Sequence, residues 1–466
     1  MGLSEFTGKK AHIIGMARSG LAAAEVLVSL GATVTIHDQK DESGLGESFI
    51  IAYKIGVETR VGNTAYEGIE EADIVVSSPG IPETCPGLVA AQAHGIPILP
   101  EIELAYRVSK APIIAVTGTN GKTTTTALIG EMLKHDGKKV YIAGNIIAGD
   151  IRMPLVKAAI NASSSDVIVA EISSFQLEWI TTFRPKVGAL LNVSADHLDR
   201  YPDLETYVRM KAKLFEYQEP TDYAVLNVDD ARVAKLASDI CSRVWKFSRT
   251  KEVELGTFAR GAEVWARTSE GEYLVCDTSK MKLRGQHNLE NVLAAAAAAL
   301  AYGINRKSIQ AAVDEFEALE HRLEPVAEIG GVEFLNNSMC TNVAASVRSL
   351  EAIGRPVIVI AGGKDKGSDY GPLGEAFVRY AKHVVLIGKD APLIEKAARD
   401  AGFDQIGRAG SMEEAVEMAW QKAERGDTVV LSPGCASFDM YNDFEHRGQV
   451  FKATVNALAK RAGVCQ

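Results

Sequence analysis

The chain has 466 residues, of which 47% are hydrophobic and 24% charged, and its formal net charge is -10 at pH 7. The length predicts about three domains, the composition excludes a disordered chain, and the negative charge argues against general nucleic-acid binding. No apolar run long enough to span a membrane is present, and the N-terminus has no signal-sequence pattern, so we expect a cytoplasmic protein without a membrane partner. The six cysteines lack paired spacing and are expected to be reduced thiols.

The N-terminal block has the pattern of a Rossmann-like α/β fold. An apolar strand over 10–15 leads through a glycine loop into an alanine-rich helix over 21–30, and the next strand ends in Asp38. The spacing of Gly15 and Gly20 is not that of a dinucleotide fingerprint, so a nucleoside diphosphate at the helix start fits as well as NAD. A purely structural turn is the alternative. Further strands over 72–76 and 96–99, with a helix after 100, complete this block.

A phosphate-binding loop is expected after the apolar strand 113–117. The loop has the short form Gly-x-x-Gly-Lys-Thr and ends in Lys122 and Thr123, with Val116 where the general P-loop pattern has its first glycine. Backbone N–H groups and the helix N-terminus would face phosphate oxygens, the lysine would add a mobile charge, and the threonine hydroxyl could ligate Mg²⁺. An ordinary glycine-rich turn is the alternative.

Polar residues follow the next predicted strands. The strand 139–145 ends in Asn145, and the strand 166–171 ends in Glu171, whose carboxylate could hold Mg²⁺ beside the phosphate loop or cap a helix. After the strand 186–192, His197 could ligate a metal or be structural.

A helix over 207–217 carries Lys211 and Lys213, and their spacing lets at most one of them point into a site. Further along, a strand over 224–230 is followed by a small β excursion at 253–283. Asn288 and Asn291 share one face of a helix, where they could contact adenine or ribose or act as N-caps.

The C-terminal block repeats the α/β alternation, with strands over 332–335, 356–361, 383–387 and 427–431. Polar or glycine-rich loops follow three of these strands, at 336–342, 362–368 and 432–437. Because the carboxyl ends of parallel strands meet at one edge of a sheet, we expect the loops to converge. We interpret this block as a second ligand-binding lid.

Taken together, the order and spacing of these motifs resemble the Mur ligases, ATP-dependent amide-forming enzymes of peptidoglycan synthesis. The resemblance covers essentially the whole chain and rests on the stretches 117–123, 171–177, 196–201, 287–291, 321–322 and 432–437. It implies three α/β domains. These are a Rossmann-like UDP-sugar-binding domain at 1–108, a central ATP-binding domain of the P-loop type with a small β excursion at 109–320, and a Rossmann-like amino-acid-binding domain at 321–466.

The resemblance also implies roles for individual residues. ATP would be bound by Gly118, Thr119, Asn120, Gly121, Lys122, Thr123, Thr124, Asn288, Asn291 and Arg322. Two Mg²⁺ ions would be held by Thr123, Glu171, His197 and Lys211, the last as an N6-carboxylated lysine, and Lys122, Glu171, His197 and Lys211 would form the catalytic set. The uridine-diphosphate substrate would contact Gly15, Met16, Ala17, Arg18, Ser19, Asp38, Ser78, Pro79, Gly80 and Asn145. Glutamate would be bound by Thr341, Lys366, Ser437 and Phe444.

The implied reaction joins D-glutamate to UDP-N-acetylmuramoyl-L-alanine through an acyl phosphate, with domain closure keeping water away. Asn337 and Met339 depart from the family pattern, which has an acid and a lysine there, so addition of L-glutamate or another amino acid is the alternative. A folylpolyglutamate synthase is disfavoured by the N-terminal block. A non-catalytic nucleotide-binding module is disfavoured by the intact set of catalytic residues. We expect a monomer.

Overall fold

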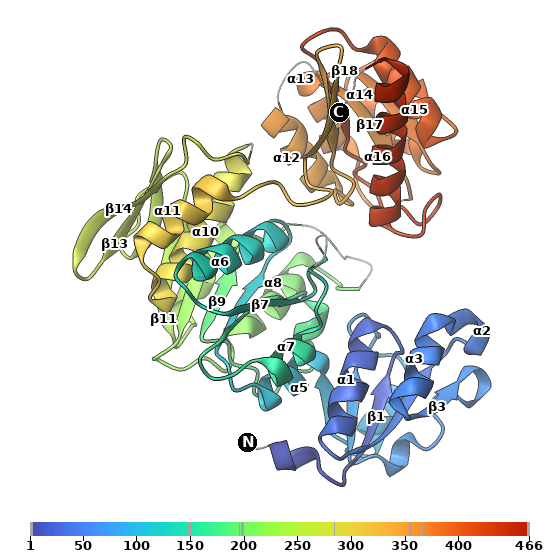
Figure 1. Ribbon diagram of the computed structural model, residues 1–466, viewed down its shortest axis with the longest axis vertical. Helices are drawn as coiled ribbons and strands as arrows, with labels where there is room; N and C mark the ends of the chain where they lie inside the picture. Colours follow the sequence, from blue (N-terminus) through green and yellow to red (C-terminus); the bar gives the residue numbers. More distant parts are fainter. Residues whose placement is uncertain are drawn as a thin grey trace. The chain divides into compact units, whose positions relative to one another are not determined.

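The computed structural model describes residues 3–147, 151–194, 196, 200–283, 285–353, 357–364 and 367–463. It contains three sheets with helices between their strands, which confirms the predicted α/β class (Figure 1). The first two sheets belong to one compact unit, formed by Met1–Val193, Glu205–Ser279 and Asn291–Val313. The third belongs to a second unit, formed by Ser194–Leu204, Lys280–Glu290 and Asp314–Gln466. Within the described ranges, every helix is too short or too polar to traverse a lipid bilayer.

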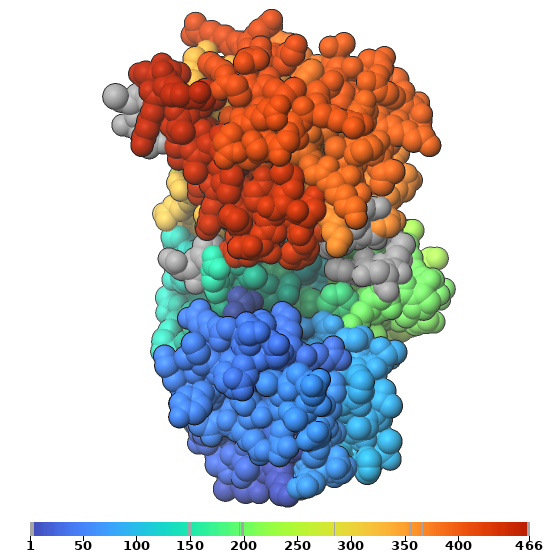
Figure 2. Space-filling view, turned by 90° about the vertical axis from the view of Figure 1, so that its right-hand side faces the viewer, coloured from blue at the N-terminus to red at the C-terminus, as the bar shows by residue number. Residues whose placement is uncertain are grey.

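The first sheet has five parallel strands in the order β3-β2-β1-β4-β5. Its strands are β1 (Lys10–Ile14), β2 (Thr33–Asp38), β3 (Glu58–Val61), β4 (Ile74–Ser77) and β5 (Ile98–Pro100). Its helices are α1 (Arg18–Ser29), α2 (Glu42–Leu45), α3 (Glu47–Ile55), α4 (Pro86–Ala93) and α5 (Glu101–Val108). The central strands are almost wholly buried, as in a parallel sheet covered on both faces. Figure 2 shows the surface of this block in blue.

The second sheet has nine strands in the order β14-β13-β12-β11-β10-β9-β6-β8-β7. They are β6 (Ile113–Thr117), β7 (Val140–Gly144), β8 (Val167–Glu171), β9 (Val187–Leu190), β10 (Tyr223–Asn227), β11 (Arg243–Ser248), β12 (Gly256–Arg260), β13 (Glu263–Thr268) and β14 (Gly271–Asp277). The helices are α6 (Lys122–His135), α7 (Leu155–Asn161), α8 (Leu204–Ala212), α9 (Ala231–Lys235), α10 (Gln286–Tyr302) and α11 (Arg306–Glu315). The strand β6 lies between β8 and β9, so its loop is flanked by the ends of both.

The predicted small β excursion is present as β12, β13 and β14, and it extends the same sheet because β12 pairs with β11. Two expectations for this block need correction. The helix expected over 207–217 is α8, which ends at Ala212 and is followed by a 3-10 turn, Lys213–Phe215. Asn288 and Asn291 lie inside α10, which begins at Gln286, so the N-cap alternative is wrong for both.

The third sheet has six strands in the order β15-β16-β20-β17-β18-β19, parallel except for the β15–β16 pair. They are β15 (Glu324–Ile329), β16 (Val332–Asn336), β17 (Val357–Gly362), β18 (Ala381–Ile387), β19 (Ile406–Arg408) and β20 (Thr428–Leu431). The helices are α12 (Val343–Ile353), α13 (Gly371–Tyr380), α14 (Ala391–Asp400), α15 (Met412–Lys422) and α16 (Phe444–Arg461). Two apolar cores cover the sheet, one formed with α12, α13 and α14 and the other with α15 and α16.

The strands β16, β20 and β17 are neighbours, so the loops that follow them lie at one edge of the sheet, as expected. Backbone hydrogen bonds link these loops directly. Asn337 N donates to Leu431 O (3.0 Å), Gly362 N donates to Pro433 O (2.9 Å), and Gly434 N donates to Cys340 O (3.0 Å).

Candidate functional site

The phosphate loop joins β6 to α6 and depends on two glycines. Gly118 and Gly121 have φ values of 153° and 87°, which favour glycine. A Cβ at position 121 would lie 2.3 Å from Asn291 Oδ1, so a side chain there would require Asn291 on α10 to move. Gly121 is also the N-cap of α6 and offers no side-chain acceptor to its first turn. The positive end of this helix therefore faces the loop, as an anion-binding loop requires.

Asn192 holds this loop in shape. Thr119 N donates to Asn192 O (2.9 Å), Asn120 N donates to Asn192 Oδ1 (2.9 Å), and Asn192 Nδ2 donates to Asn120 O (3.0 Å). The two polar atoms of the Asn192 side chain thus bind the backbone N–H and C=O groups of Asn120. We did not predict Asn192 as a site residue. Its place just after β9, the neighbour of β6, is the signal that could have found it.

Glu171, at the end of β8, accepts hydrogen bonds from two predicted site residues. Thr123 Oγ1 donates to its Oε2 (2.7 Å), and Asn145 Nδ2 donates to its Oε1 (3.0 Å). The carboxylate is buried, with 2% of Glu171 exposed. The structure therefore brings together the hydroxyl and the carboxylate predicted to hold Mg²⁺. These hard oxygen donors beside a phosphate loop fit that ion.

The two lysines of the α8 segment diverge, as expected from their spacing. Lys211 is 1% exposed, and its Nζ donates to Gly118 O in the phosphate loop (3.0 Å) and lies 4.5 Å from the centroid of the Tyr207 ring. Lys213 Nζ donates instead to Glu178 O (3.0 Å). Lys211 is therefore the lysine beside the loop. Lys122 Nζ donates to Thr119 O (3.0 Å) within the same loop.

Other predicted nucleotide contacts are placed as follows. Thr124 is buried in the first turn of α6, and Thr125 Oγ1, one residue further on, donates to Asn291 Oδ1 (3.4 Å). Asn288 is buried near the start of α10. The predicted metal ligand His197 and the predicted glutamate contact Lys366 lie outside the described residues.

Arg322 lies in a strained turn between two residues with left-handed backbone conformations, His321 (φ 64°) and Leu323 (φ 47°). Hydrogen bonds fix this turn from both sides. His321 N donates to Glu324 Oε2 (2.9 Å), and Leu323 N donates to Asn337 Oδ1 (3.2 Å). The turn thus sets the position of the Arg322 backbone.

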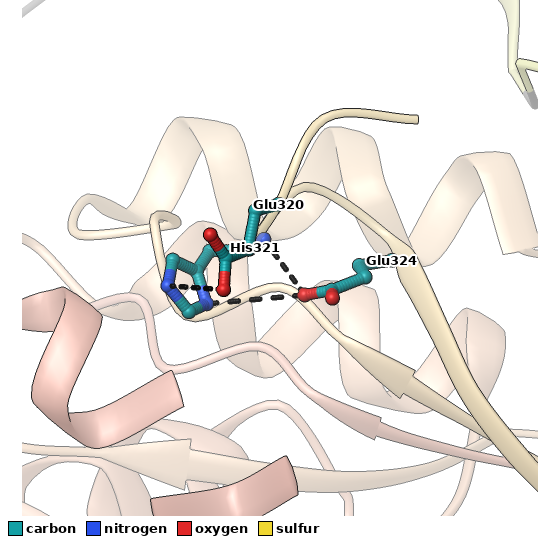
Figure 3. Close-up of side chains that lie close together, drawn as sticks. All are labelled: Glu320, His321 and Glu324. Carbon is teal, nitrogen blue, oxygen red and sulfur yellow. Dashed lines mark hydrogen bonds and ion pairs between the residues drawn. The ribbon is translucent and has the colours of Figure 1, made fainter. Parts of the chain in front are cut away.

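Glu320, His321 and Glu324 cluster in this turn, as three side chains that could surround a metal ion (Figure 3). The hydrogen bonds argue against one. Asn336 Nδ2 donates to His321 Nδ1 (2.8 Å), which leaves the ring proton on Nε2, 3.7 Å from Glu320 Oε1. The Lys452 ammonium forms ion pairs with both glutamates. Although burial alone would lower the pKa of Lys452, its hydrogen bond to Glu324 raises it. The cluster is therefore an ion-pair network, and we assign no metal to it.

The loops predicted to bind the uridine diphosphate meet at the carboxyl ends of β1, β2 and β4. Met16 N donates to Asp38 Oδ2 (2.9 Å), and Ser78 Oγ donates to Gly15 O (3.0 Å). A Cβ at Gly20 would lie 1.9 Å from Gly15 O, which explains this second glycine. The remaining predicted residues, Ala17, Arg18, Ser19, Pro79 and Gly80, lie in the same loops or in the first turn of α1. Asp38 and Gly15 line a cavity of about 230 Å³ beside these loops.

The predicted glutamate contacts Thr341, Ser437 and Phe444 lie in two of the converging loops and at the start of α16. Ser338, three residues before Thr341, donates through Oγ to Phe444 O (2.7 Å). This bond ties the loop after β16 to the first turn of α16.

Arg447 connects these segments and was missed by the sequence analysis. It is 1% exposed; its Nε donates to Ser338 Oγ (3.0 Å), its Nη2 to Ser338 O (2.8 Å) and its Nη1 to Cys435 O (3.1 Å). Burial lowers the pKa of Arg447 to about 10. One guanidinium thus fixes the loops that carry Thr341 and Ser437.

The two departures from the family pattern lie in the same loop. Asn337 donates through Nδ2 to Ser349 Oγ (2.9 Å) and accepts from Leu323 N through Oδ1. Both ends of the amide are therefore paired with neutral groups. Met339 is half-buried, and its backbone N donates to His321 O (3.2 Å).

Comparisons with known proteins cover nearly the whole chain. Three family models match in series: the Mur ligase MurD-like N-terminal domain at residues 9–100, the Mur ligase middle domain at 116–299, and the Mur ligase glutamate ligase domain at 321–435. Proteins named UDP-N-acetylmuramoylalanine--D-glutamate ligase are similar over their full length. The one from Pelotomaculum thermopropionicum is 45% identical and the one from Thermoanaerobacter pseudethanolicus 42% identical, each over 98% of this chain and 100% of the relative.

Solved structures share the fold at lower identity. The UDP-N-acetylmuramate-alanine ligase MurC of Thermotoga maritima has a TM-score of 0.63 at 18% identity, covering 97% of this chain and 100% of that one. The MurF ligase of the same organism, solved in complex with ADP, has a TM-score of 0.59 at 14% identity, covering 98% and 97%. The three serial family models and the full-length relatives above 40% identity establish that the chain belongs to the Mur ligase family.

Proposed function

We propose that the chain joins D-glutamate to UDP-N-acetylmuramoyl-L-alanine, with cleavage of ATP to ADP and phosphate. The observation that carries this proposal is the full-length similarity, at 40–45% identity, to several relatives whose names state that activity. Within the family, residues 1–108 would bind the uridine nucleotide, 109–320 the ATP, and 321–466 the amino acid. The chain would act as a cytoplasmic monomer without a nucleic-acid or membrane partner.

A carboxylate is a poor acyl donor, because its oxygen is a poor leaving group. The reaction therefore begins by activating the carboxylate. An oxygen of the L-alanine carboxylate attacks the γ-phosphorus of ATP, the bond to ADP breaks, and an acyl phosphate forms. The glutamate amine then attacks the acyl carbon, and the resulting tetrahedral centre expels phosphate and leaves the amide.

The chain's own residues suit these steps. The phosphate loop, shaped by its two glycines and by Asn192, would hold the triphosphate against the positive end of α6. Lys122 would leave Thr119 O and neutralise charge on the transferred phosphoryl group.

Mg²⁺ would be held by Thr123, Glu171, His197 and an N6-carboxylated Lys211, and when bound it would offset negative charge on the phosphates. The contacts of Lys211, a carbonyl oxygen and an aromatic face, suit the ammonium form. Carboxylation would convert this buried cation into an anion, so it would exchange these contacts for metal ligation.

The amino acid would be bound by Thr341, Lys366, Ser437 and Phe444. The hydrogen bonds of Arg447 and Ser338 support this assignment, because they hold the loops of three of these residues at one edge of the third sheet.

The test is phosphate release by the full chain with ATP, Mg²⁺, UDP-N-acetylmuramoyl-L-alanine and either enantiomer of glutamate. We expect release with D-glutamate. Absence of release with both enantiomers would refute the ligase proposal. Release with L-glutamate alone would move the assignment to an L-glutamate-adding ligase, the alternative raised by Asn337 and Met339.

A further inference from the structure

Tyr66 has a strained backbone at the edge of the first block's cavity. Its φ is 73°, and His321 and Leu323 are the other non-glycine residues with a positive φ in the described part of the chain. A bulky side chain in this region is unusual and strained. Such strain persists only where the surroundings impose it, so the contacts of Tyr66 need an explanation.

His37 holds Tyr66 in this conformation, because it contacts both its backbone and its ring. Tyr66 N donates to His37 Nδ1 (3.2 Å), and the two rings stack with centroids 6.2 Å apart and an angle of 22° between their planes. On another side the tyrosine ring lies against the first turn of α4, where a Cβ at Gly87 would be 2.6 Å from Tyr66 Cδ1. Backbone and ring are thus both fixed.

A second histidine supports the first. His37 Nδ1 accepts from Tyr66, so the neutral ring carries its proton on Nε2, which lies 3.0 Å from His12 Nδ1 and donates to it. The two rings stack with centroids 5.0 Å apart. Burial lowers the pKa of both histidines, that of His37 to about 3, so the pair stays neutral near pH 7. His12 on β1 and His37 on β2 therefore form a rigid support.

The tip of the tyrosine lies beside polar side chains. Burial, and after it the interaction with the Cys85 side chain, raises the pKa of Tyr66. Tyr66, Cys85 and Gln39 all line the cavity, together with Asp38 and Gly15. The cavity therefore has a fixed aromatic wall with an amide and a carboxylate at its margin.

This lining suits a flat heterocycle. An aromatic face stacks with the π face of a base, while amide and carboxylate groups can pair with the N–H and carbonyl groups of its edge. The cavity also adjoins the loops of Gly15 and Ser78, where the diphosphate attached to the base would bind.

We propose that Tyr66 is a specificity-determining residue that stacks on the uracil ring of the UDP-linked substrate, and that His12 and His37 are positioning residues that hold it there. The inference rests on the proposed function for the identity of the base. It adds residues that neither the sequence motifs nor the family resemblance assigned.

The test is calorimetric titration of the full chain with UDP, which requires no turnover, and with ADP as a probe of the central block. Loss of one stacking contact is worth about 1–3 kcal/mol, so Tyr66→Ala should weaken UDP binding about 5- to 150-fold. The affinity for ADP should stay within about twofold. Tyr66→Phe, which keeps the ring, should retain most of the affinity for UDP. Tyr53→Ala, at a 79% exposed position on α3, is the matched control and should change neither.

The positioning role has its own pair of variants. His37→Leu removes the acceptor for Tyr66 N and should weaken UDP binding, whereas His37→Asn places an oxygen near the position of Nδ1 and should restore part of it.

Unchanged UDP affinity in Tyr66→Ala would overturn the stacking role, and so would an equal loss of UDP and ADP. Unchanged affinity in His37→Leu, with Tyr66→Ala weakened, would overturn the positioning role. A chain that fails to release phosphate in the ligase assay but shows the Tyr66-dependent binding would refute the proposed function and leave this inference standing.

Discussion

Asn192 offers a direct test of how the phosphate loop is held. Asn192→Ala removes two hydrogen bonds to the backbone of Asn120 and keeps the backbone bond from Thr119 N to residue 192. Each lost bond is worth about 0.5–1.5 kcal/mol, so ordering the loop around ATP should cost about 1–3 kcal/mol more. That range corresponds to about a 5- to 150-fold higher KM for ATP.

The assay is steady-state phosphate release with ATP varied, repeated with the UDP-linked substrate and with glutamate varied. We expect the KM for ATP to rise and the other two to change less than about twofold. Calorimetric titration with ADP should show the same loss of affinity, which separates binding from turnover. Asn161→Ala is the control, because Asn161 is exposed and its side chain donates one hydrogen bond, to Lys157 O within α7. A KM for ATP within twofold of the parent value, in a folded Asn192→Ala protein, would refute the role of this residue.

Three further predictions concern buried charges. Lys211→Ala should abolish phosphate release, and short-chain carboxylates should restore part of it if the lysine acts as a carbamate. Lys213→Ala, the control, should stay active. Near-parent activity of Lys211→Ala would contradict the assignment. Burial raises the pKa of Glu101 to about 7, so the folded chain binds more protons than the unfolded chain between about pH 4.5 and 7 and loses stability as pH rises through that range. Glu101→Gln should therefore make Tm less dependent on pH between 5 and 8, and an unchanged pH dependence would argue against the raised pKa. Glu103 accepts hydrogen bonds from the backbone N–H groups of residues 181–183. Glu103→Gln should therefore destabilise this contact by about 3 kcal/mol and speed amide exchange there about 100-fold, as measured by mass spectrometry. Exchange at the parent rate would show that these bonds contribute little.

The sequence predicted most strands of the three sheets because their apolar runs are short and end in polar or glycine loops. The strands β3, β11, β15 and β19 were missed. In β15 most residues are only half-buried or exposed, so the strand lacks an apolar run, and β19 has three residues. Helix α8 ended earlier than expected because its last turn tightens to a 3-10 turn at Lys213, which hydrophobic periodicity does not report.

Residues that known motifs predict to contact phosphate or metal could be named from the sequence, as with Thr123 and Glu171, whose side chains the structure brings together. Residues that act through tertiary hydrogen bonds could not. Arg447 reads as one charged residue of an amphipathic helix, and its burial becomes visible only when the loops after β16 and β20 meet it. The left-handed backbone of Tyr66 likewise follows from a contact between residues far apart in the sequence.

The antiparallel extension of the second sheet has a practical consequence. Its outer strand β14 is six strand positions from β6, which at about 4.8 Å per strand is about 29 Å. The turn between β13 and β14, at Ser269 and Glu270, is thus far from the phosphate loop and belongs to an outer hairpin of the sheet. A fluorophore or affinity tag inserted there would label or immobilise the enzyme while leaving the phosphate loop undisturbed.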